Sequence, residues 1–375
     1  MDERTTEYRN RNTLMTKQNS RPLRSAPRGA ALLLLKLLVL GVFATAWQLG
    51  AQELRFADLG DFSLVSGQVI QRCKIGYRTF GELDEKKSNG ILFPAWFSGS
   101  SQDLAQYIGP GKMVDSSKYF VIAVDPLGNG VSSSPSNSTA QPGAAFPRFT
   151  IRDMVVSQHR LVTETLGISR LRAVMGISMG GMQTLQWIVS YPAFIDKAVT
   201  IVGSPRLAPY DLLLWTTQLA IIEEALKDHA DPREARTAAM GMIARIQDLA
   251  LSTPAHFNAG VTRETLERSI AQKSAERIQR SDPYDWAAQL RAMIDHDVTQ
   301  PFGGDVDRAA AEVEAEVLVV AAEQDHMVTP GPVLEFAEHL DADTVILDGD
   351  CGHLAPGCEL KEMQEAVRDF LDQLD

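Results

Sequence analysis

Several kinds of function are excluded by what this 375-residue chain lacks. It has three cysteines and seven histidines, and they are not spaced like the ligands of a structural zinc site. It contains neither a phosphate-binding P-loop nor the glycine run of a dinucleotide-binding fold. Its formal net charge of −12 leaves no basic excess for a phosphate backbone. We therefore predict no metal, no cofactor and no nucleic-acid partner.

The first 51 residues differ from the rest of the chain. A basic lead with arginines up to Arg28 precedes an apolar run over residues 30–46, which only Lys36 interrupts. This order is typical of a secretory signal peptide, and cleavage fits after Ala46 or Ala51. The uninterrupted apolar part is shorter than the ~20 residues that a membrane span needs. We predict export, periplasmic or secreted, with an N-terminal membrane anchor or a cytoplasmic protein as alternatives.

Residues 176–180, with the sequence GISMG, are the most informative motif. An apolar strand is predicted over 171–175 before the motif, and a helix is predicted after it. A Gly-x-Ser-x-Gly motif between strand and helix is typical of a nucleophile elbow, in which a sharp turn exposes the serine. A helix N-terminus also favours the negative charge that develops during attack. We predict that Ser178 is the nucleophile.

A serine nucleophile needs a base and an acid that orients the base. A strand predicted over 315–322 leads to Asp325, and a strand over 344–347 leads to His353. The carboxyl ends of parallel strands meet at one edge of a sheet, and the order Ser, Asp, His along the chain matches this arrangement. We predict that His353 accepts the proton of Ser178 and that Asp325 fixes the imidazole tautomer.

Other residues compete for the acid and base roles. Glu323 lies closer to its strand than Asp325, and the side chain of His326 should point away from that of its neighbour. Asp348 and Asp350 precede His353 too closely to reach its ring. The remaining histidines fall on expected helices or cap loops, where we expect solvated or structural groups: His159, His229, His256, His296 and His339.

The tetrahedral intermediate also needs backbone N–H donors for its oxyanion. One is expected from Met179, which follows the nucleophile. The other should come from the loop after a strand predicted over 91–97. Phe97 is the candidate, and Ser98 is the alternative. An ordinary polar loop over Ser98–Ser101 is also compatible with the sequence.

Several of these segments resemble the homoserine O-acetyltransferase group of the α/β-hydrolase superfamily. The elbow with its following residues (176–183), the FTIRDMV block (149–155), the loop at 98–101 and the segment 125–135 carry the similarity. It covers roughly residues 60–205 and 315–372. The resemblance implies an α/β-hydrolase fold and acyl transfer through an acyl-enzyme, with transfer from acyl-CoA to an alcohol as one outcome.

The fold class expected is α/β, with a mostly parallel sheet flanked by helices and an inserted helical cap. We divide the chain into a core over 52–205, a cap over 206–305 and a second core segment over 306–375. Alternation over 69–81 indicates an antiparallel edge strand. An amphipathic helix is expected to close the fold, with Met363, Val367, Phe370 and Leu371 on one face.

Two positions depart from the acetyltransferases that the chain resembles. In that family an aspartate follows the catalytic histidine, where this chain has Leu354, and helps to hold the substrate's amino group. An arginine early in the family's cap binds the substrate carboxylate. No arginine occurs between Arg206 and Arg233. The residues LLLW over 212–215 suggest an apolar cap surface. Arg206 is either a displaced partner for the substrate carboxylate or a solvated residue.

We therefore predict an ester hydrolase acting on a small-molecule ester or acyl substrate. An acyl-CoA-dependent O-acyltransferase is the alternative. A non-catalytic binding relative of the fold is a second alternative, which a complete Ser-Asp-His set opposes. A homodimer is compatible with the sequence.

Cys351 and Cys358 bracket His353. Gly352 and the Pro356-Gly357 pair permit a tight fold-back, so that the cysteine Cα atoms can lie within the ~7 Å that a disulfide allows. An exported protein would permit the bridge. The alternative is two buried thiols with Cys73 as a third.

Overall fold

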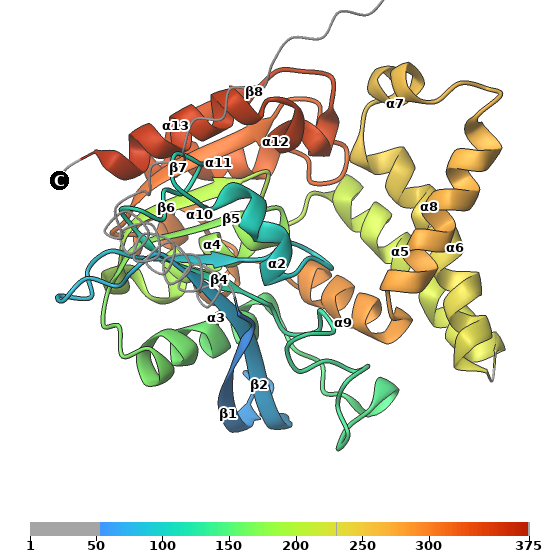
Figure 1. The fold of residues 1–375 in the computed structure, drawn as a ribbon, viewed down its shortest axis with the longest axis horizontal. Helices are drawn as coiled ribbons and strands as arrows, with labels where there is room; N and C mark the ends of the chain where they lie inside the picture. The colour runs from blue at the N-terminus through green and yellow to red at the C-terminus, as the bar shows by residue number, and fades with distance from the viewer. Residues whose placement is uncertain (1–52, 230, 374–375) are drawn as a thin grey trace, which may run out of the picture. The chain divides into compact units, whose positions relative to one another are not determined.

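The computed structural model describes residues 53–229 and 231–373 (Figure 1). The predicted signal peptide or anchor over 1–51 lies outside the described residues. Among the helices of those two ranges, none combines the length and hydrophobicity that a membrane crossing requires.

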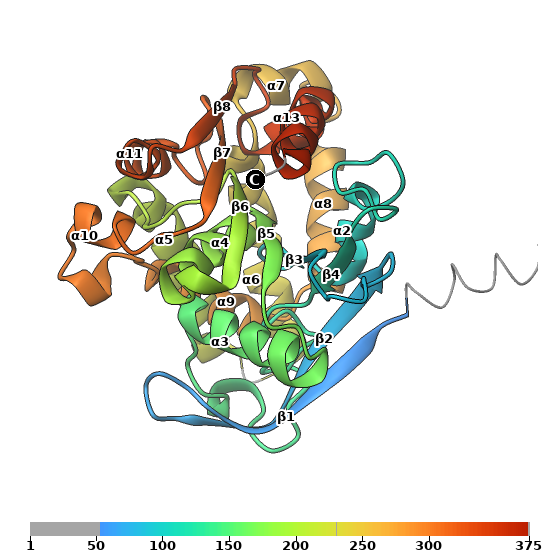
Figure 2. The same ribbon diagram turned by 90° about the vertical axis from the view of Figure 1, so that its left-hand side faces the viewer.

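One eight-stranded sheet organises the described chain, in the order β1-β2-β4-β3-β5-β6-β7-β8. The first two strands pair antiparallel, β2 also pairs antiparallel with β4, and all later pairings are parallel, which confirms the predicted fold class. Figure 2 shows the sheet's twist from its side. The strands are β1 (Arg55–Ser63), β2 (Val69–Phe80), β3 (Gly90–Pro94), β4 (Phe120–Val124), β5 (Leu171–Ile177), β6 (Ile195–Ile201), β7 (Glu316–Ala322) and β8 (Asp343–Leu347).

The prediction that residues 69–81 form an edge strand is wrong. β2 is the second strand, because β1 pairs with its outer side. The register between β1 and β2 shifts twice, between Asp58 and Gly60 and between Gly60 and Phe62. These irregularities interrupt the alternation of β1, and such bulges are common at sheet edges. This explains why the first strand gives no clear signal in the sequence.

Helices cover both faces of the sheet. On one face, α3 (Ile151–Arg160), α4 (Met179–Ser190) and α11 (Gly331–Leu340) pack into a core with inward side chains of the central strands. On the other face, α2 (Ser101–Leu104) and α13 (Leu360–Asp372) do the same. The predicted apolar face of the last helix is confirmed, because Met363, Val367, Phe370 and Leu371 are all buried.

In the described chain, five α-helices form the cap, and they precede α10 (Val306–Ala310) on the way from β6 to β7. Figure 1 shows α5, α6 and α8 packed together to one side of the sheet. The segment leaves and rejoins the core at one place, where the Val298 N–H donates to the Pro205 carbonyl at 2.9 Å and the backbones of Arg206 and Asp297 form an isolated antiparallel β-bridge. The helices are α5 (Pro209–Asp228), α6 (Pro232–Leu251), α7 (Pro254–Gly260), α8 (Leu266–Arg280) and α9 (Pro283–Ile294).

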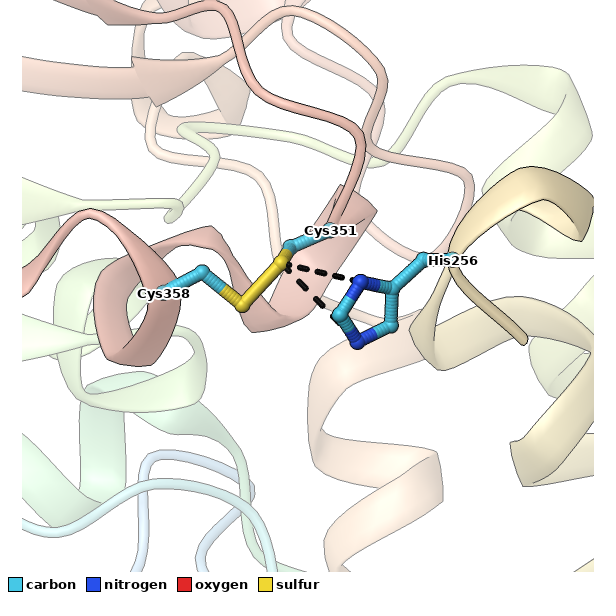
Figure 3. A group of neighbouring side chains, drawn as sticks. All are labelled: His256, Cys351 and Cys358. Atoms are coloured by element: carbon cyan, nitrogen blue, oxygen red, sulfur yellow. Dashed lines mark hydrogen bonds between the residues drawn. A yellow bond between two sulfur atoms is a disulfide. The ribbon is translucent and has the colours of Figure 1, made fainter. Parts of the chain in front are cut away.

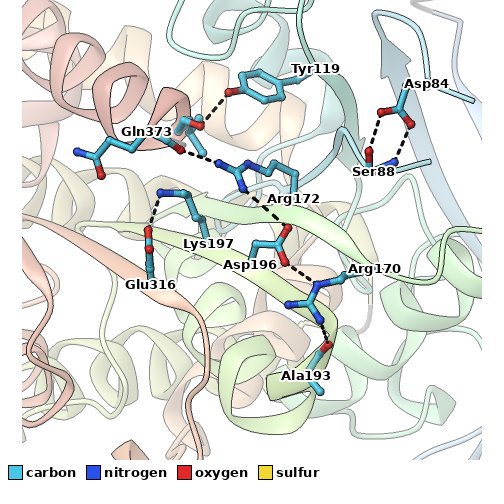
Figure 4. A network of polar contacts seen from close by, with 11 residues as sticks. Asp84, Ser88, Tyr119, Arg170, Arg172, Ala193, Asp196, Lys197, Glu316 and Gln373 are labelled. Atoms are coloured by element: carbon cyan, nitrogen blue, oxygen red, sulfur yellow. Dashed lines mark hydrogen bonds and ion pairs between the residues drawn. The ribbon is translucent and has the colours of Figure 1, made fainter. Parts of the chain in front are cut away.

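A network of polar side chains lies at the amino-terminal ends of the parallel strands β5, β6 and β7 (Figure 4). The Lys197 side chain is 1% exposed, pairs with Glu316 at 2.5 Å and lies 4.7 Å from the centre of the Phe370 ring. Nearby, Asp196 accepts a hydrogen bond from Arg170. A buried ammonium group needs such a partner, because desolvation of an unpaired charge is costly. These groups stabilise the end of the sheet opposite to Ser178.

The loop that carries His353 is cross-linked. Cys351 and Cys358 form a disulfide with their Cα atoms 6.5 Å apart. Figure 3 shows His256, from cap helix α7, against this bridge. The His256 Nδ1 atom lies 3.3 Å from the Cys351 sulfur and 3.4 Å from an oxygen of Asp350. The bridge therefore holds the histidine loop, and a cap residue packs on it.

We predict that the denatured protein, prepared without reductant from an oxidising compartment, exposes one reactive thiol, that of Cys73. In the folded state this thiol should be inert, because burial raises its pKa to about 12. Converting both bridge cysteines to serine should lower the free energy of unfolding by about 2.5 kcal/mol, as expected for a short closed loop. Thiol counting and chemical denaturation measure these effects. Three reactive thiols in the denatured protein would rule out the bridge.

Candidate active site

Ser178 occupies a strained turn between β5 and α4. Its backbone angles are φ 58° and ψ −122°, a conformation that is rare for a residue with a side chain. The glycines around it are required by close packing. A Cβ on Gly176 would lie 2.1 Å from the Gly180 backbone, and one on Gly180 would lie 2.5 Å from the Pro94 carbonyl oxygen. The turn projects the serine hydroxyl above the carboxyl ends of the strands.

The structure brings Ser178, His353 and Asp325 into one hydrogen-bonded line. The His353 Nε2 atom lies 2.9 Å from the Ser178 hydroxyl oxygen. Its Nδ1 atom lies 2.6 Å from the Asp325 carboxylate. Asp325 is 4% exposed and His353 is 8% exposed. This is the geometry in which a histidine accepts a serine proton while a carboxylate orients its ring.

Asp325 is fixed by its own loop. One carboxylate oxygen accepts hydrogen bonds from the backbone N–H groups of Met327 and Val328, at 2.8 and 3.0 Å. The other oxygen is left for His353. Its sequence rivals Glu323 and His326 are exposed and have no hydrogen bond to His353 within the described ranges. Backbone donors therefore set the orientation of the carboxylate that the histidine meets.

The other histidines have different partners. In the described part of the chain, none of them is hydrogen-bonded to Ser178. His296 is buried against the Ser204 carbonyl, and burial lowers its pKa to about 4. The others contact surface or cap groups: His159 stacks on Tyr191, His229 pairs with Glu234, His256 packs on Cys351 and His339 pairs with Asp307.

The hydrogen bonds of the loop after β3 separate the two oxyanion candidates. The Ser98 N–H donates to the side-chain oxygen of Gln289 at 2.9 Å. The N–H groups of Phe97 and Met179 donate to no residue in the described ranges. Met179 is the first residue of α4, where backbone N–H groups lack partners inside the helix. Phe97 and Met179 thus have free donors, and Ser98 does not.

Sequence reasoning missed Gln289, a buried residue of α9. Its amide nitrogen donates to the Leu127 carbonyl at 3.0 Å while its oxygen holds Ser98. Gln289 therefore ties the loop after β3 to the loop after β4. No local signal marks this role, because the Ser98 contact spans 191 residues.

Asp125 also connects the loops that follow β3 and β4. Its buried carboxylate accepts hydrogen bonds from the N–H and hydroxyl of Ser101 and from the side chain of Asn129. Burial raises the pKa of this carboxyl group, although the hydrogen bonds oppose the shift. Asp125 lies in the 125–135 segment that carries part of the family resemblance.

A cavity of about 810 Å³ contains the Ser178 and His353 side chains. Its inner wall is aromatic. The Phe97 ring meets Trp286 edge to face at 4.5 Å and Trp215 at 5.8 Å. Leu354, which is 43% exposed, lines the cavity beside His353. The volume is within the range usual for small-molecule sites.

The cap side of the cavity is more polar than the apolar segment over 212–215 predicts. Arg236, Arg277 and Arg280 line it, together with Asp282 and Asp285. These residues belong to α6, α8 and the start of α9, beyond the 212–215 segment on which the apolar expectation rests. From that segment, only Trp215 lines the cavity. Arg206 instead pairs with Glu335 at 3.2 Å.

Comparisons with known proteins agree with this architecture. Residues 93–356 match the model of the alpha/beta hydrolase fold family. An ethyl acetate hydrolase from Pseudomonas veronii is 33% identical over 286 residues, covering 72% of this chain and 80% of that protein. A homoserine O-acetyltransferase from Methanohalophilus mahii is 41% identical over 170 residues, covering 40% of this chain and 35% of that protein.

A solved structure gives the same result. The crystal structure of an acetylester hydrolase from Corynebacterium glutamicum superposes with a TM-score of 0.80 at 26% identity, covering 86% of this chain and 96% of the other. The predicted resemblance to the homoserine O-acetyltransferase group is confirmed by the relatives of that name. The chain belongs to the α/β-hydrolase fold family, and it is an ester hydrolase or acyltransferase of that fold.

Proposed function

We propose that this enzyme hydrolyses small esters through an acyl-enzyme on Ser178. The observation that carries the proposal is the continuous hydrogen-bonded line from Ser178 through His353 to Asp325, exposed to a cavity of substrate size. We assign Ser178 as nucleophile, His353 as general base and acid, and Asp325 as the group that orients the imidazole. The N–H groups of Phe97 and Met179 are assigned to the oxyanion.

The chemistry proceeds in two halves. The Ser178 oxygen attacks the ester carbonyl carbon as His353 takes its proton, and the carbonyl oxygen becomes an oxyanion between the two N–H donors. The carbon–oxygen bond to the alcohol then breaks, and His353 gives its proton to the leaving alcohol. Water attacks the acyl-enzyme in the same way and releases the acid. Asp325 stabilises the imidazolium in both halves.

Hydrolysis is favoured over transfer by two observations. A relative that matches over most of the chain is named for ethyl acetate hydrolysis. Leu354 lies in the cavity at the position that follows His353, so that position supplies no acid for an amino group. Acyl transfer to homoserine is the second candidate, because relatives of that name also match, one at 41% identity over 170 residues and others at 26% to 28% identity over 82% to 87% of this chain.

We also propose that the protein is exported. The support is the signal-like composition of residues 1–51 together with the Cys351–Cys358 bridge, since disulfides persist mainly in oxidising compartments. Outside the cytoplasm acyl-CoA would be scarce, which also favours water as the acceptor.

We predict that Ser178→Ala lowers kcat about 10⁶-fold and that Asp325→Asn lowers it about 10⁴-fold, as in other serine hydrolases. Stability should change little on removal of the serine hydroxyl. Steady-state kinetics with a short-chain ester measures both effects, and a fluorophosphonate probe should label the wild type but not the alanine variant. If Ser178→Ala keeps a tenth of the activity, another residue is the nucleophile.

Gln289→Ala should lower kcat by about 10- to 100-fold with a smaller change in KM, because a loosened loop displaces the Phe97 N–H from the oxyanion. Titration with the fluorophosphonate probe separates this from misfolding, since the variant should still label fully. Gln272→Ala, at an exposed position of α8, is the matched control and should behave as wild type. Equal kcat values for the Gln289 variant and the control would contradict the positioning role.

We expect homoserine with acetyl-CoA to turn over poorly, while short neutral esters are cleaved. The physical reason is that Leu354 cannot pair with the amino group of the acceptor. Product analysis by mass spectrometry with each substrate measures the two activities. A kcat/KM for homoserine acetylation at or above ~10⁴ M⁻¹s⁻¹, the lower end for ordinary enzymes, would make the transferase assignment the better one.

A further inference from the structure

Arg277 is a cation in the substrate cavity without a hydrogen-bonded partner. It lies in the last turn of α8, lines the cavity that holds Ser178, and is half-buried. No hydrogen bond or ion pair joins its guanidinium to another residue within 53–229 and 231–373. Asp248 attracts it, but that carboxylate is hydrogen-bonded to Lys273 at 2.8 Å. A guanidinium has five N–H donors, and here they are available to a ligand.

The Trp286 ring fixes the position of this guanidinium. The Arg277 Cζ atom lies 4.6 Å from the centre of the ring, a cation–π contact. The same ring packs edge to face against Phe97, whose backbone N–H we assign to the oxyanion. Trp286 thus contacts both the cation and the residue whose N–H is assigned to the oxyanion. A group bound by Arg277 would therefore belong to the molecule that is attacked at Ser178.

The charges along the cavity indicate what this group is. Arg236 is neutralised by Asp282 at 2.7 Å. The carboxylate of Asp103 accepts hydrogen bonds from Ser100, and that of Asp285 accepts them from Ser136. Arg280 lies close enough to repel Arg277. A singly charged carboxylate would relieve this repulsion, and the carboxylates of Asp103 and Asp285 repel it less than they repel a doubly charged phosphate.

We propose that Arg277 is a specificity-determining residue that binds a carboxylate group of the substrate. The enzyme then prefers esters that bear one free carboxylate, in the acyl or the alcohol half, over neutral esters of the same shape. A planar carboxylate accepts two parallel hydrogen bonds from a guanidinium, which a lysine or a neutral side chain does not provide. This inference rests on the proposed hydrolysis for its turnover test, and its binding test is independent of hydrolysis.

Two matched substrate pairs test the proposal. Monoethyl glutarate is compared with its neutral amide, and 3-acetoxypropanoate with 3-acetoxypropanamide, so that the charge lies in the acyl half or in the alcohol half. For at least one pair the wild type should show a charged-to-neutral ratio of kcat/KM of about 10 to 100, the range for a hydrogen-bonded charge. Arg277→Met, which keeps an apolar stem over Trp286, should bring this ratio to about 1. Arg277→Lys should give an intermediate ratio.

Arg268→Met is the matched control, because Arg268 is exposed on the same helix and does not line the cavity. It should leave the ratio as in wild type. Ratios near 1 for both pairs in the wild type would overturn the proposal, as would an Arg277→Met variant that loses equal activity on charged and neutral esters.

A binding experiment separates this inference from the proposed hydrolysis. In Ser178→Ala, calorimetry should show tighter binding of one charged ester than of its amide, and the added Arg277→Met substitution should remove the difference. If the wild type cleaves no ester, the proposed function fails while this measurement still decides the role of Arg277. Equal binding of charged and neutral members in both pairs would refute the carboxylate site.

Discussion

The close approach of three backbones around Ser178 is the constraint on which the site depends. The Ser178 N–H donates to the Ile201 carbonyl of β6, while Gly180 touches the Pro94 carbonyl of β3 and Gly181 leaves no room for a Cβ beside Thr200. A residue with φ of 58° persists only where surrounding contacts determine it. The spacing between β3, β5 and β6 therefore determines the backbone conformation of the turn at Ser178. The burial of α4, which follows the turn, offsets the strain of that conformation.

The same sheet explains why the three catalytic candidates meet although His353 lies 175 residues from Ser178. Ser178 follows β5, Asp325 follows β7 and His353 follows β8, and these strands run parallel in the order β5-β6-β7-β8. Parallel strands in register end at a common edge. That relation is readable in a sequence, because each of these strands is a short apolar run with a polar residue shortly beyond it. The candidate Ser, Asp and His positions were therefore predictable without coordinates.

What the sequence did not predict depends on contacts between distant segments. The choice between Phe97 and Ser98 depends on the Gln289 side chain, which reaches the loop from the cap. The arginines of the cavity come from α6 and α8, whose solvent-facing and cavity-facing sides look alike in a polar sequence. The first strand is masked by bulges at the sheet edge. In each case the local pattern is weak or ambiguous, and tertiary packing decides the outcome.

The cap contacts the candidate site through two of its helices, α9 and α7. Through Gln289 it holds the loop that carries the Phe97 donor, and through His256 it packs on the disulfide beside His353. It enters and leaves the core at a single point, and further hydrogen bonds between the core and Asp211, Thr253 and Asp285 help to fix its position over the sheet. In the proposed mechanism, substrate selection by cap residues and the geometry of the reacting groups are consequently coupled. Changes in the cap should then alter kcat, in contrast to changes in a lid that only controls access.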